Sequence, residues 1–140
     1  MILVKEYRVE YAHRLPDHGG KCKNIHGHSG IVKVAFEGVV QEESGMVADF
    51  GHFSWLEELI NNLDHSLLLK QDDPIVEVLA NFGFRILLLS FPPTAEVLTQ
   101  YLITNIQHLM VAQDIKGLKL QYVEFVETPG NAVCNFVEGS

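Results

Sequence analysis

The chain has 140 residues, of which 47% are hydrophobic, and a formal net charge of −8. This length suits a single domain over residues 1–140, and the composition suits a packed core rather than a disordered tail. The acidic balance argues against general nucleic-acid binding, and no run of about 20 apolar residues predicts a membrane span. The N-terminus lacks a signal-peptide pattern, and two cysteines, Cys22 and Cys134, make no disulfide framework. We therefore expect a cytoplasmic protein with free thiols.

Two strands are predicted at the start of the chain. Residues 4–14 alternate, so that Tyr7, Val9, Tyr11 and His13 share one face. Residues 15–23 contain proline and glycines and are expected to form a loop. Residues 29–40 are rich in β-branched side chains and should pair with the first strand.

The second half alternates between helices and strands. Asp49 can cap a helix that extends to about residue 63, and a second helix is predicted over residues 95–110. Strands at 118–127 and 132–137 should form a hairpin around residues 129–131. Residues 66–92 are less regular, and we expect a short helix followed by an added strand or packed loop at 84–89. The pattern predicts an α+β fold with antiparallel strands and helices on one face.

Three histidines form a candidate metal site. His26 and His28 are two residues apart, which places both imidazoles on one face of an extended chain. His13 ends the neighbouring predicted strand and could meet them. Three imidazoles leave zinc an open fourth position, as in catalytic sites. Asp17 and His18 in the adjoining loop are rival ligands.

Cys22 lies four residues before His26, between Lys21 and Lys23. In one interpretation it is a ligand in a structural site, together with Cys134, and His13 has no role. In the other it is a base or nucleophile beside a three-histidine zinc, since nearby cations and a metal stabilise a thiolate. The spacing alone does not choose between them.

Four further residues could have either a chemical role or a purely structural one. Asp64 could orient His65 for proton transfer, or His65 could simply cap the preceding helix. Glu127 follows an apolar strand, where most acidic residues merely mark an exposed end. Thr94 is predicted to be the N-cap of the last helix.

Taken together, the motifs at 12–15, 20–28, 45–50, 63–65, 93–96 and 126–128 resemble the family of 6-pyruvoyl-tetrahydropterin synthase and 6-carboxytetrahydropterin synthase. The resemblance implies the tunnelling fold (T-fold), in which each subunit supplies a four-stranded antiparallel sheet and two helices. Three subunits would close a barrel, and two trimers would stack into a homohexamer.

The resemblance also implies roles for individual residues. Zinc would bind His13, His26 and His28, and Cys22 would abstract a proton. Asp64 and His65 would form a relay, while Glu127 would hold the pterin and Thr94 would contact it. Residues 1–33 carry six of the ten basic side chains. Our candidates for binding the triphosphate of the substrate are therefore Arg14, Lys21 and Lys23.

The implied reaction converts 7,8-dihydroneopterin triphosphate to 6-carboxy-5,6,7,8-tetrahydropterin, with loss of acetaldehyde and triphosphate, in the queuosine (deazapurine) pathway. The short Cys-x3-His spacing resembles this branch. The alternatives are a lyase that makes 6-pyruvoyl-tetrahydropterin or cleaves the dihydroneopterin side chain, and a non-catalytic, zinc-stabilised oligomer that binds a pterin or purine. Three features depart from the family pattern: Gly30 stands where an aromatic residue is common, Ala95 replaces a hydroxyl residue, and residues 73–92 form an insertion.

Overall fold

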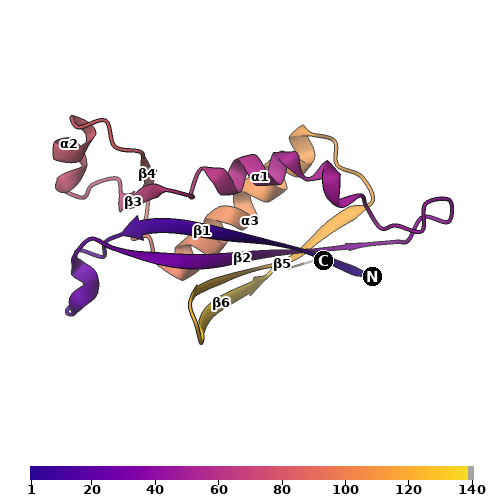
Figure 1. Ribbon diagram of the computed structural model, residues 1–140, viewed down its shortest axis with the longest axis horizontal. Helices are drawn as coiled ribbons and strands as arrows, with labels where there is room; N and C mark the ends of the chain where they lie inside the picture. Colours follow the sequence, from indigo (N-terminus) through magenta and orange to yellow (C-terminus); the bar gives the residue numbers. More distant parts are fainter. Residues whose placement is uncertain (139–140) are drawn as a thin grey trace.

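The computed structural model describes residues 1–138 and consists of one twisted sheet with two helices, Ser54–Asn61 and Ala95–Ala112, over one face (Figure 1). The strands are β1 (Ile2–His13), β2 (His26–Gly38), β3 (Ser66–Lys70), β4 (Ile86–Leu89), β5 (Leu118–Thr128) and β6 (Asn131–Phe136). The helices are α1 (Ser54–Asn61), α2 (Ile75–Ala80) and α3 (Ala95–Ala112), with 3-10 turns at Lys21–Lys23 (η1) and Phe50–His52 (η2). No helix among these residues is long and apolar enough to cross a membrane.

The sheet is larger than predicted. Its order is β4-β3-β1-β2-β5-β6, so the expected four antiparallel strands are extended by two. Both additions run parallel to their neighbours: β3 pairs with only the last three residues of β1, and β4 pairs with β3. The strand at 66–70 was missed because a five-residue apolar run carries no alternation that separates strand from loop. Of the two alternatives for residues 84–89, an added strand or a packed loop, the structure has the strand, β4, over the last four residues.

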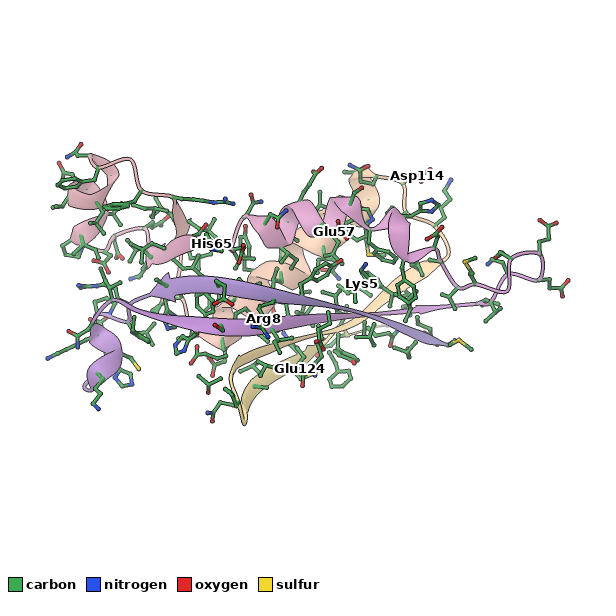
Figure 2. All side chains as sticks on the ribbon, viewed as in Figure 1. Lys5, Arg8, Glu57, His65, Asp114 and Glu124 are labelled. Atoms are coloured by element: carbon green, nitrogen blue, oxygen red, sulfur yellow. The ribbon has the colours of Figure 1, made fainter. Side chains whose placement is uncertain are left out.

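The two helices bury the alternating face of the central strands. Val9, Val32, Val34, Leu120, Val123 and Phe125 pack beneath Leu56, Leu98, Leu102 and Ile106, all of them buried. The first helix begins later than predicted, because Asp49 caps η2 by accepting the Gly51 N–H, and α1 starts only at Ser54. At its edge Lys5 of β1 extends toward Glu57 of α1, with Nζ 3.8 Å from Oε1 (Figure 2). Burial of these apolar side chains beneath the helices specifies the register in which β1 and β2 pair.

The 73–92 segment is anchored by a buried ion pair. Arg14 Nε lies 2.8 Å from Asp73 Oδ2, and the Asp73 side chain is fully buried. The Nε–H is not aimed along a good hydrogen-bond direction, so the contact is mainly electrostatic. Asp73 Oδ1 also accepts the Ile75 N–H at the start of α2. The loop after His13 is therefore joined to the base of the segment.

Replacing Asp73 with alanine should destabilise the protein by about 3 kcal/mol, because Arg14 would be left without its buried partner. Urea denaturation at fixed protein concentration measures the change. Asp72→Ala is the matched control: Asp72 pairs with Lys70 at the surface, and its loss should cost less than about 0.5 kcal/mol. Equal effects of the two substitutions would show that the buried pair has no special role in stability.

Candidate metal centre and active site

The three histidines meet where β1 ends and β2 begins. Strand register places His13 opposite His26 and Tyr11 opposite His28. His13 and His28 thus point to the helix-covered face, and the ring centroids of the three histidines lie 4.6–5.1 Å apart. Their ligand nitrogens all lie within 4.8 Å of one another, and this is the group among residues 1–138 that is placed to share one metal. It contains neither Cys22 nor Cys134, and neither rival, Asp17 nor His18.

The outer nitrogens of two rings are fixed by backbone carbonyls. His13 Nδ1 lies 2.7 Å from the Pro93 oxygen, and His26 Nδ1 lies 2.8 Å from the Asn24 oxygen. A carbonyl can only accept, so both Nδ1 atoms must carry the proton. Both Nε2 atoms are then bare in the neutral rings, although they lie only 3.0 Å apart.

Two bare lone pairs at this distance repel each other unless a cation lies between them. A proton is disfavoured, because burial lowers the pKa of His13 despite the nearby carbonyl. His28 Nε2 is also buried and has no hydrogen-bond partner. Three imidazole nitrogens in a tetrahedral zinc site would lie ~3.3 Å apart. The donor set therefore fits a metal ion, and the carbonyls supply the outer contacts that orient metal-binding histidines.

A cavity of about 460 Å³ reaches this cluster through Glu127, while the three histidines are not among the described residues that form its wall. Its wall includes Cys22, Thr94 and Glu127, three residues predicted from the sequence, together with His18. Glu127 connects the cavity to the histidines, since Oε1 lies 3.8 Å from His28 Nε2. Cys22 is half-buried in η1, and its thiol is free, as is that of Cys134.

Thr94 is the N-cap of α3, as predicted: its Oγ1 accepts the Val97 N–H at 3.3 Å. The preceding Pro93 carbonyl is the acceptor for His13. One turn of chain thus supplies both a wall of the cavity and an orienting contact to the candidate ligand. The positive end of the α3 dipole also faces this wall.

The candidate triphosphate contacts lie apart from this cavity. Arg14 is engaged with Asp73, as described above. Lys21 and Lys23 are exposed on η1 on either side of Cys22. Among residues 1–138, the wall of this cavity includes neither Arg14 nor Lys21 nor Lys23.

Asp64 and His65 are brought together, but elsewhere. Asp64 Oδ2 lies 2.8 Å from His65 Nδ1, and Asp64 Oδ1 accepts the Glu10 N–H at 2.8 Å. These contacts lower the pKa of Asp64, the Glu10 amide most of all, so the carboxylate is ionised. His65 lines a second cavity, of about 430 Å³, formed by β1, β3 and the 73–92 segment. Within one chain, Cys22 and His65 therefore face different cavities.

Tyr11 is a site residue that the sequence did not identify. Its ring packs against His13 and His28, with centroids 5.3 and 5.7 Å away, and its hydroxyl donates to Glu127 Oε2 at 3.3 Å. A side chain at Gly30 would have its Cβ 3.2 Å from the Tyr11 ring. Tyr11 thus occupies space next to position 30, which accounts for the glycine there. The signal was present in the alternation that puts Tyr11 and His13 on one face.

Comparison with known proteins agrees with this geometry. The chain is 37% identical over 93 residues to a probable 6-carboxy-5,6,7,8-tetrahydropterin synthase of Halobacterium salinarum, covering 65% of this chain and 59% of that relative. It is 34% identical to the 6-carboxy-5,6,7,8-tetrahydropterin synthase of Rickettsia conorii, covering 81% of this chain and 88% of the relative. The fold matches Caenorhabditis elegans 6-pyruvoyl tetrahydropterin synthase with a TM-score of 0.71 and 22% identity, over 99% and 96% of the two chains. Residues 2–136 match the family described as 6-pyruvoyl tetrahydropterin synthase, and the chain belongs to that family of enzymes.

Proposed function

We propose that this chain is a zinc-dependent 6-carboxy-5,6,7,8-tetrahydropterin synthase, which converts 7,8-dihydroneopterin triphosphate with release of acetaldehyde and triphosphate, in the queuosine (deazapurine) pathway. The observation that carries the proposal is the convergence of three histidine side chains that Glu127 links to a cavity whose wall includes Cys22, Thr94 and Glu127. The names of the Halobacterium and Rickettsia relatives favour this product, as does the Cys-x3-His spacing.

The proposed residue roles follow from placement and chemistry. His13, His26 and His28 would hold zinc, which as a Lewis acid supports the removal of protons next to substrate hydroxyls. Glu127 is held by Tyr11, and its carboxylate can accept two N–H groups from the pterin edge. Cys22, on the same cavity wall, is the base that takes a proton from the substrate side chain. Thr94 closes the wall against the ring.

His65 is assigned the second proton transfer. Asp64 fixes the Nδ1–H of His65 and leaves Nε2 free to exchange a proton. Because His65 and Cys22 line separate cavities of one chain, we propose that each site combines Cys22 of one subunit with His65 of another.

This arrangement requires an oligomer, and the sheet has open edges suited to one. β3 covers only Tyr11–His13 of β1, so the outer edge of residues 2–9 has no neighbouring strand among residues 1–138. The opposite edge of the sheet is β6. Open edges of this length are normally paired or covered, and pairing β1 with β6 of the next subunit would close a barrel. We propose a homohexamer of two stacked trimers.

Light scattering should therefore give a mass about six times the 15.7 kDa of one chain. Met1 and Gly38 exchange both backbone hydrogen bonds, so by alternation the Glu6 N–H points away from β2. Glu6→Pro should remove that donor and break the assembly into smaller species, while Glu6→Ala should assemble normally. A fully active monomer would contradict the proposal.

Mass analysis of the products formed from 7,8-dihydroneopterin triphosphate tests the reaction. The expected products are 6-carboxytetrahydropterin, acetaldehyde and triphosphate. Triphosphate release with 6-pyruvoyl-tetrahydropterin would identify the alternative lyase, and release of the side chain would identify an aldolase-type cleavage. Tight pterin binding without turnover would identify a non-catalytic binding oligomer, and each of these three results would overturn the proposal.

A further inference from the structure

The backbone of His65 has an unusual conformation, and hydrogen bonds from Glu10 of β1 hold it. Its φ is +54°, in the left-handed region that non-glycine residues rarely adopt. From the β1 side, the Glu10 carbonyl accepts the His65 N–H at 2.5 Å, and the Glu10 N–H donates to Asp64. A single residue at the sheet edge thus holds both members of the Asp64–His65 pair.

Arg85, in the 73–92 segment, holds the pair from the other side. Its Nη2 donates to the carbonyl of Asn61, the last residue of α1. Its backbone oxygen accepts the Leu67 N–H at 2.9 Å in the β3–β4 ladder. Arg85 is therefore bonded to the chain on both flanks of His65, four residues before it and two residues after it.

Arg85 also shares the cavity of about 430 Å³ with His65, whose position after α1 is seen in Figure 2. Ile25, Leu79 and Phe84 make much of the remaining wall apolar. The positive charge of Arg85 helps to lower the pKa of Asp64, after the larger contributions of the Glu10 amide and His65. An ionised Asp64 keeps the proton on His65 Nδ1. Arg85 therefore favours this tautomer of His65 through its charge, and it fixes the backbone on both sides of His65 through its hydrogen bonds.

We propose that Arg85 is a positioning residue for His65, and that the 73–92 segment is retained as a brace for this acid–base group. The inference rests on the proposed function, in which His65 exchanges a proton with substrate. In this proposal the 73–92 segment contributes no group that touches the reacting atoms. It acts only by holding His65 in position in the active site to which His65 belongs.

Arg85→Ala should lower kcat about tenfold on 7,8-dihydroneopterin triphosphate, while KM changes less than about twofold, because a displaced His65 slows proton transfer without altering pterin contacts. Arg85→Lys keeps the charge but loses the forked donor, and its kcat should lie between those of the parent protein and Arg85→Ala. Lys70→Ala is the control: it removes a cation that forms a surface pair with Asp72 and should leave kcat unchanged. A rise in KM with normal kcat would overturn the proposal in favour of a substrate contact.

A double-mutant cycle separates positioning from general damage. If Arg85 acts through His65, Arg85→Ala should cause no further loss of kcat in a His65→Ala background. Two losses that multiply would overturn the proposal, since they would mean that Arg85 acts independently of His65.

Hydrogen exchange gives a readout that does not depend on turnover. Peptides covering residues 61–69 should exchange faster in Arg85→Ala than in the parent protein, because the bond to Asn61 is lost beside a strained turn. Lys70→Ala should not change them. Unchanged exchange in Arg85→Ala would overturn the inference even in an active enzyme. Faster exchange in a protein that does not convert the substrate would leave Arg85 as a brace of the turn and show that the proposed function had failed instead.

Discussion

Replacing His26 with alanine should leave purified protein without its metal, whereas the parent chain should hold about one zinc per subunit. The reason is geometric: a three-histidine site has no spare ligand, and the bare Nε2 atoms of His13 and His26 lie 3.0 Å apart, where only a shared cation relieves their repulsion. Losing a ligand should weaken zinc binding by more than the ~10–100-fold cost of losing an outer-shell contact. Elemental analysis after dialysis measures the metal content.

His26 is preferred over His13 for this test because it is half-buried, whereas His13 is 2% exposed and part of the core. Circular dichroism should show that His26→Ala remains folded. The controls are Cys22→Ala and His18→Ala, which line the neighbouring cavity and should keep the metal. If Cys22→Ala loses zinc while His13→Ala retains it, the site is a structural one and Cys22 is not a free base.

Much of this centre could be predicted because it depends on local patterns. Strand alternation places His26 and His28 on one face, and pairing of adjacent strands brings His13 beside them. The N-cap at Thr94 follows from its position before a helical repeat. Cys22, Thr94 and Glu127 were assigned through the family resemblance, and the structure brings all three to one cavity.

The parts that sequence reasoning missed depend on distant segments. The carbonyls of Pro93 and Asn24 fix two imidazole tautomers, but every residue has a carbonyl, so nothing in the sequence marks these two. The Arg14–Asp73 contact joins positions 59 residues apart, and Arg14 was therefore read only as a free cation. The pairing of β3 with three residues of β1 depends on where α1 ends, and helix boundaries are poorly defined by sequence.

Glu127→Gln should lower kcat/KM on 7,8-dihydroneopterin triphosphate by about a hundredfold or more. If Glu127 accepts two pterin N–H groups, glutamine keeps the shape but replaces one acceptor with a donor that faces another donor. The variant loses a charge-assisted bond and leaves a desolvated N–H unpaired, which together cost several kcal/mol. The Tyr11 hydroxyl can still donate to the remaining amide oxygen, so the side chain should stay in position.

Glu124→Gln is the matched control, because Glu124 lies on the same strand but points to the face opposite the core and pairs with Lys33 at 2.8 Å. That change should alter kcat/KM less than about threefold, since surface pairs contribute little. Zinc content and oligomer mass should be normal in both variants, which excludes unfolding as the cause. If Glu127→Gln also loses less than about threefold, Glu127 does not bind the pterin: it would then be a strand-end residue that only orders Tyr11 near His28, and the cavity beside Cys22 would need another group to recognise the ring.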